Sequence, residues 1–145
     1  MSERTRSLHL VRETTSFRLP GDVVARLDAR ARALGTTRTT LAEQYLDEGL
    51  RLVEHPGIVF RDGPAGRRPG IAGGLDVWEI VETIRANKGS LVEAAAYHEV
   101  PRHVIETAAR YYAAYPDEID AWIRANDELL EREERLAAEQ RRLLG

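Results

Sequence analysis

The chain has 145 residues, of which 43% are hydrophobic and 31% charged, and its formal net charge is −3. This balance is typical of an ordinary globular protein and argues against a disordered chain. No run of 18 apolar residues is present, which excludes a membrane-spanning helix. The opening MSERTRSLHL lacks the apolar core of a secretion signal, and the absence of cysteine excludes disulfides and thiolate chemistry. We therefore expect a cytoplasmic protein of one domain or two small ones.

Charge is distributed unevenly along the chain. Residues 1–38 contain eight arginines and four acidic residues, a net charge of +4. Residues 117–145 contain five arginines and nine acidic residues, a net charge of −4. A basic head favours a polyanionic partner, and an acidic tail favours a protein partner. Ordinary surface solvation is the alternative explanation for both.

The segment TTSFRLP, residues 14–20, alternates polar and apolar side chains with the period of a β-strand. Its polar face carries Thr14, Ser16 and Arg18, and its apolar face carries Phe17 and Leu19. No second strand follows within forty residues, and a lone strand leaves its backbone groups unpaired. A second copy of the chain could pair with it as an antiparallel ribbon, which fits the major groove of DNA. The sequence thus predicts a homodimer whose outward polar residues face bases.

Two helices are predicted after this strand. Residues 22–34 place apolar side chains at helical spacing, and Gly35 is a typical helix-ending residue. Thr36 and Thr37 can cap a second helix over residues 38–53. We expect that helix to bury five side chains, namely Leu41, Tyr45, Leu46, Leu50 and Val53.

The segment TTSFRLPGDVVARLDARARALGTTRTTLAEQYLDEGL resembles a ribbon-helix-helix repressor domain of the CopG/Arc/MetJ type. The resemblance covers residues 12–53 and includes Gly35-Thr36-Thr37-Arg38-Thr39, which opens the second helix as in that family. It implies base reading by Thr14, Ser16 and Arg18. It also implies phosphate binding at the start of the second helix, by Thr37, Arg38 and Thr39. Arg12, just before the predicted strand, is a further phosphate-binding candidate. A helix N-terminus offers free N–H groups to an anion, which agrees with this role.

A second domain is predicted over residues 55–116. GIVFRDGPAGRRPGIAGG has the composition of two short strands joined by a Gly/Pro turn. Three short helices are expected after it, over residues 75–87, 91–98 and 101–115, with Ser90 as a cap and Pro101 in a first turn. The motif DVWEI at residues 76–80 and ARYY at residues 109–112 make this part similar to a C-terminal module of some VapB-type antitoxins. The resemblance implies a regulator that also silences a PIN-domain ribonuclease toxin.

The last predicted helix covers residues 117–144, and its apolar residues form doublets seven residues apart. Such a stripe can dock in the groove of a partner protein. The residues expected to bind the partner are Trp122, Ile123, Leu129, Leu130 and Leu136. Arg132, Arg135, Arg141 and Arg142 are candidates to pair with carboxylates of a nuclease metal site. Packing on its own domain, or a coiled coil with a second copy, are the alternatives.

Other chemistries have weak support. His98 and His103 are five residues apart with Pro101 between them, which does not fit a zinc-binding H-E-x-x-H helix. The glycines of residues 63–74 lack the G-K-[S/T] of a phosphate loop. Asp76, Glu79 and Glu82 have the spacing of acids on a solvated helix face. We expect no enzyme, no metal and no cofactor.

The combined expectation is a mainly α protein with an N-terminal ribbon-helix-helix, a β-hairpin plus helical domain, and a long C-terminal helix. Its expected function is that of a nucleoid-associated antitoxin. As a homodimer, or a larger assembly on DNA, it would bind double-stranded operator DNA, and it would neutralise a PIN-domain toxin. A stand-alone repressor or segregation-type DNA-binding protein is the first alternative. A pure interaction protein that never binds DNA is the second.

Overall fold

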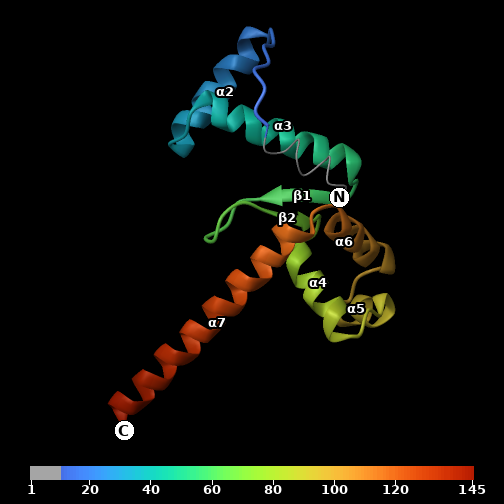
Figure 1. Ribbon diagram of the computed structural model, residues 1–145, viewed down its shortest axis with the longest axis vertical. Helices are drawn as coiled ribbons and strands as arrows, with labels where there is room; N and C mark the ends of the chain where they lie inside the picture. The colour runs from blue at the N-terminus through green and yellow to red at the C-terminus, as the bar shows by residue number, and fades with distance from the viewer. Residues whose placement is uncertain (1–10) are drawn as a thin grey trace. The chain divides into compact units, whose positions relative to one another are not determined.

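The computed structural model describes residues 11–145 and is mainly helical, with one two-stranded antiparallel sheet (Figure 1). The chain divides into two compact units, the first ending at Glu54 and the second extending from His55 to Gly145. The expectation of a mainly α fold with a small hairpin is therefore confirmed at this level. Across the described residues, each helix is too short or too polar to cross a membrane.

The first unit contains two helices, α2 (Gly21–Leu34) and α3 (Arg38–Glu54). Gly35 adopts a left-handed conformation with φ 66° and ends α2, as the sequence predicts. The Thr37 hydroxyl then accepts the backbone N–H of Thr40 at 3.1 Å and thereby caps α3. Gly35 and Thr37 thus fix where α2 ends and where α3 begins.

Few side chains of the first unit are buried. Among its described residues, Ala31 and Leu41 are the buried apolar ones. Four of the five side chains that the second predicted helix was expected to bury are exposed, namely Tyr45, Leu46, Leu50 and Val53. That expectation was wrong for the single chain, because two helices share one seam and have no third layer to cover their other faces.

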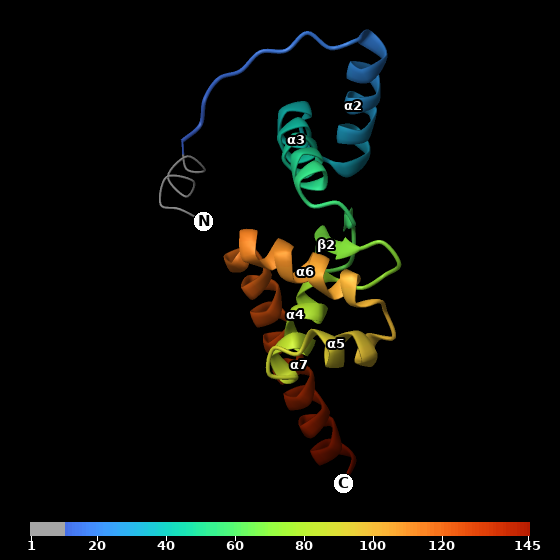
Figure 2. The same cartoon turned by 90° about the vertical axis from the view of Figure 1, so that its right-hand side faces the viewer.

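Residues 11–20 form neither a helix nor a strand, and all of them are exposed. Figure 2 shows this segment as a coil that leads into α2. The predicted strand at residues 14–20 is thus not formed in the single chain, where no partner strand is available to complete a ladder. Phe17 and Leu19, the apolar face of this segment, are exposed in the single chain.

The second unit begins with a hairpin of β1 (Ile58–Arg61) and β2 (Arg68–Ile71), paired in the register Ile58 with Ile71. Four helices follow: α4 (Val77–Ala86), α5 (Leu91–His98), α6 (Arg102–Ala114) and α7 (Pro116–Leu144). The predicted hairpin and helices are present, with small shifts at their ends. Helix α4 begins two residues later than predicted because Asp76 is its N-cap, and Pro101 is the N-cap of α6 rather than part of its first turn.

A closed core holds the second unit together. It combines the hairpin with all four helices, and the fully buried Tyr111 of α6 is its largest member. Ile119 and Ile123 bring the first turns of α7 into this core. The last helix, which the sequence sets apart as residues 117–145, is therefore anchored in the second unit. Its C-terminal half extends beyond α4 to α6 in both views (Figures 1 and 2).

Candidate nucleic-acid interface and partner surfaces

The residues predicted to read bases lie on the exposed segment before α2. Thr14, Ser16 and Arg18 are all exposed. Among the described residues, no carboxylate forms an ion pair with Arg18, so its guanidinium is available to a ligand within that part of the chain. An exposed guanidinium can bind guanine through two hydrogen bonds. The structure leaves these side chains accessible, and their arrangement on a shared strand face is a prediction about the dimer.

Three of the four predicted phosphate-binding residues, Thr37, Arg38 and Thr39, lie at the turn between α2 and α3. Thr37 is the N-cap of α3, and Thr39 is exposed on its first turn. Arg38 is already occupied, because its Nε and Nη2 each donate to an oxygen of Asp28 at 2.6 Å. This two-pronged pair joins α2 to α3, and it was not anticipated from the sequence.

The pair with Arg38 shifts the protonation of both groups. The hydrogen bonds from Arg38 lower the pKa of Asp28, helped by the positive charges of Arg38 and Arg32 and opposed by slight desolvation. The same hydrogen bonds raise the pKa of Arg38. Both side chains are therefore charged at neutral pH. The Asp28 carboxylate of α2 thus places a full negative charge beside the first residue of α3.

Arg12, the remaining predicted phosphate contact, also has an internal partner. Its Nη1 lies 3.1 Å from Oε1 of Glu43, and both side chains are largely exposed. Pairs of this kind are screened by solvent and are easily exchanged for another anion. The first unit thus balances two of its predicted DNA-contacting arginines with its own carboxylates.

The DVWEI motif of the second unit has a structural role. The buried Asp76 carboxylate accepts hydrogen bonds from Arg61 at 3.0 Å, from Arg68, and from Trp78 Nε1 at 3.2 Å. Its backbone N–H donates to Glu79 at 2.9 Å, which completes a capping box at the start of α4. Asp76 therefore fastens the hairpin to α4. The sequence singled out the motif for its family resemblance, and this network is the physical reason for its composition.

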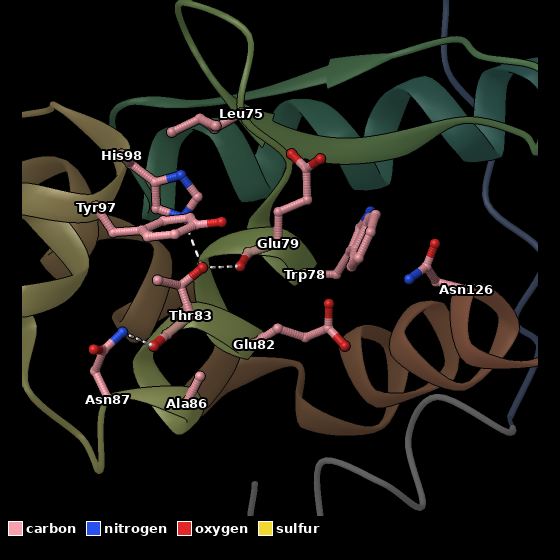
Figure 3. Close-up of a pocket in the computed structure, with 10 residues that line it drawn as sticks. All are labelled: Leu75, Trp78, Glu79, Glu82, Thr83, Ala86, Asn87, Tyr97, His98 and Asn126. Atoms are coloured by element: carbon pink, nitrogen blue, oxygen red, sulfur yellow. Dashed lines mark hydrogen bonds between the residues drawn. The ribbon is translucent and has the colours of Figure 1, made fainter. Parts of the chain in front are cut away.

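A groove of about 700 Å³ lies beside α4, with α5 and α7 contributing to its walls (Figure 3). The Thr83 hydroxyl donates to the Glu79 carbonyl at 2.9 Å, and its oxygen also lies 2.8 Å from His98 Nε2, within hydrogen-bond distance. The contact between Thr83 and His98 thus joins α5 to α4.

Glu82 is the unusual carboxyl group of this groove. Burial raises its pKa, repulsion by Asp127 and Glu79 adds to the effect, and Arg85 opposes it. Arg85 is engaged elsewhere, at 2.8 Å from Asp120 and 2.7 Å from the Tyr112 hydroxyl. Within residues 11–145, no group of three or more His, Asp or Glu side chains is arranged to hold a metal ion.

The predicted partner-binding residues of α7 fall into two classes. Ile123 is buried in the core and is not available to a partner, which corrects the prediction. Trp122 is half-buried and lines a smaller groove of about 340 Å³ together with Trp78. A Cβ atom added to Gly66 of the hairpin loop would lie 3.6 Å from the Trp122 ring, so this ring packs close to the loop. The remaining members are exposed: Leu129, Leu130, Arg132, Arg135 and Leu136.

Sequence reasoning missed Asp28 and the groove beside α4. Asp28 had a visible signal, since it is an acid among the arginines of α2, at positions 26, 30 and 32. The groove beside α4 had no such signal in the sequence. Its walls come from three helices, and hydrophobic periodicity does not reveal how these helices pack together. Comparisons with protein-family models, with curated proteins and with solved structures gave no match.

Proposed function

We propose that the protein is a homodimeric DNA-binding regulator of the antitoxin type, whose first unit pairs with a second copy and binds operator DNA. The observation that carries this proposal is the exposed apolar face of α3. Leu46, Leu50 and Val53 are 55%, 63% and 80% exposed, and their spacing of four and three residues places them on one helix face. A water-exposed face of this kind is typical of an interface.

A second copy would complete the first unit in two ways. Burying each large side chain contributes about 1.5–3 kcal/mol, and a symmetric dimer buries every such residue twice. Pairing residues 14–20 with their counterpart would also supply the missing ladder and give Phe17 and Leu19 a helical surface to cover. Both gains come from the same partner, which favours a homodimer over an unrelated protein.

The charge of the first unit supports DNA as its ligand. Residues 11–38 contain six arginines and three acidic residues, and the base-reading and phosphate-binding candidates all lie within this stretch except Thr39, which directly follows it. Two copies would present two Arg18 side chains and two N-termini of α3. Such a surface can neutralise several phosphates and read a symmetric site.

The antitoxin part of the proposal rests on the C-terminal half of α7. Leu129, Leu130 and Leu136 are each more than half exposed, although α7 is anchored in the second unit by its first turns. An anchored helix that presents apolar side chains can lie in a groove of a partner protein. Together with the resemblance to VapB-type antitoxins, this favours a PIN-domain ribonuclease as partner, with Arg132 and Arg135 close enough to the stripe to meet its carboxylates.

DNA binding is tested by titrating labelled duplex from the upstream region of the gene and following anisotropy at several salt concentrations. We expect a steep loss of affinity with salt, and Arg18→Ala should weaken operator binding by about 1–3 kcal/mol. Arg102→Ala in the second unit, whose side chain pairs with Glu106, is the matched control and should bind as the wild type does. Salt-independent or absent binding would contradict the proposal.

Toxin binding is tested by co-expression with the product of the neighbouring gene and a pull-down. Leu136→Glu is the informative variant, because its side chain is exposed and its loss leaves the core intact. Trp122→Ala is less suitable, since that ring packs near the hairpin loop. Leu136→Glu should reduce capture and leave DNA affinity unchanged. Undiminished capture would show that this stripe is not the docking surface.

A further inference from the structure

The contact between Asp28 and Arg38 brings a carboxylate to the place where a DNA phosphate is expected. Asp28 comes from α2, whereas Arg38 is the first residue of α3, next to the Thr37 cap. Two parallel hydrogen bonds of 2.6 Å join them. Arginine binds carboxylates and phosphates through the same fork, so the two anions compete for one set of donors.

We propose that Asp28 is an internal competitor for DNA phosphate: it holds the Arg38 guanidinium in the free protein and thereby lowers affinity for duplex of any sequence. The inference rests on the proposed DNA-binding function. It assigns Asp28 a role in setting the overall affinity for duplex, because phosphate contacts contribute equally to all sites whereas base contacts do not. An internal carboxylate that weakens the phosphate contacts leaves the base contacts as a larger share of the total binding free energy.

The counterion balance gives this role a measurable signature. A phosphate neutralised by an arginine releases its condensed cation, with a slope of about −0.9 in log K against log salt. When Arg38 leaves Asp28 for a phosphate, the freed carboxylate takes up a cation, which offsets part of that release. Removing the carboxylate should therefore make binding both tighter and more dependent on salt.

The test compares Asp28→Asn with wild type on a short mixed-sequence duplex and on the operator fragment. We expect Asp28→Asn to bind the mixed-sequence duplex roughly two- to tenfold more tightly, as expected for one exposed charge pair, and with a slope steeper by up to about 0.9. The ratio of operator to mixed-sequence affinity should stay unchanged, because a phosphate contact contributes equally to both duplexes. Asp28→Glu, which keeps the competing charge, should behave as wild type.

Asp22→Asn is the matched control for net charge. Asp22 lies on the same helix and is exposed, and its ion-pair contact is with Arg26 at 4.0 Å. If Asp28 acts through Arg38, the effect of Asp28→Asn should exceed that of Asp22→Asn and should shrink to the control value in an Arg38→Ala background. Unchanged thermal midpoints would show that the variants differ in binding and not in folding.

The outcomes separate the two claims. Weaker binding by Asp28→Asn would show that the carboxylate positions Arg38 for DNA. Equal effects of Asp28→Asn and Asp22→Asn would show that Asp28 acts only through its contribution to the net charge. Either result overturns the inference while the DNA-binding function stands. If no variant, nor the wild type, shows salt-dependent binding to duplex, the proposed function fails and the competitor role fails with it.

Discussion

The two units of the chain differ in how much of their own apolar surface they bury. The second unit has a closed core of twelve buried residues from the hairpin and four helices. The first buries Ala31 and Leu41 among its described apolar residues and leaves one face of α3 open. Both have regular hydrophobic spacing, so periodicity alone does not separate them. The number of packed layers separates the two units, because a helix face is covered only when another element lies on it.

This comparison indicates where each unit obtains its stability. The second unit has the contacts for a fold complete within one chain, with Asp76 fastening its hairpin to α4. The first unit has one helix-to-helix seam and an unpaired segment, so its stability should depend on protein concentration. Substitutions in the two units, each with a control variant, can test this difference.

The largest effect is expected for Leu46→Glu on the open face of α3. In a monomer, a substitution at a 55%-exposed position changes stability by no more than about 0.5 kcal/mol. In a symmetric dimer it removes two buried side chains and buries two unpaired charges, a loss of more than about 4 kcal/mol in dimer stability. Sedimentation should show monomers at concentrations where wild type is dimeric.

The control for Leu46→Glu is Leu143→Glu near the end of α7, where the side chain is 85% exposed. It introduces the same charge without touching α3 and should remain dimeric. If the wild-type protein sediments as a monomer and keeps its full helicity, the first unit is stable without a partner. The proposed difference in stability between the two units is then wrong.

The next largest effect is expected for Asp76→Asn in the second unit. Loss of the carboxylate charge leaves Arg61 and Arg68 without a counterion in a partly buried site, at a cost of about 3 kcal/mol in the free energy of unfolding. Both tryptophans, Trp78 and Trp122, belong to this unit, so fluorescence in urea reports on it alone.

Asp62→Asn is the matched control for Asp76→Asn. Its exposed carboxylate lies 3.3 Å from Arg67, and loss of such a pair costs less than about 1 kcal/mol. Equal urea midpoints for the two variants would mean that the buried network does not hold the hairpin to α4.

The smallest effect is expected for Glu82→Gln beside the groove. Burial and the neighbouring Asp127 and Glu79 raise the pKa of Glu82, so the folded protein binds its proton more tightly than the unfolded chain. Ionisation therefore costs stability as the pH rises above the ordinary pKa of 4.5, and the cost is absent below it. Glu82→Gln should be more stable than wild type at neutral pH, by less than about 1 kcal/mol, and equally stable in acid.

Exposed Glu133→Gln on α7 is the control and should not show this pH dependence. Thermal midpoints measured across the acid range check both variants. A Glu82→Gln protein that is less stable at neutral pH would mean that a cation already compensates the Glu82 carboxylate.

The sequence by itself determined the succession of helices and the hairpin. Gly35 ends α2 and Ser90 caps α5, and each acts through backbone conformation or a hydrogen bond within a few residues. Such local effects do not depend on what the element packs against. The expected helix ends therefore agree closely with the structure.

Only the tertiary structure decided which apolar residues are inside and which charged groups meet. Ile123 is buried while Leu130, one stripe position later, is exposed, because the hairpin and α4 to α6 cover only the first turns of α7. Asp28 reaches Arg38 because the turn at Gly35 folds α3 back along α2. Burial and pairing depend on neighbours that are distant in sequence, and helical spacing contains no information about them.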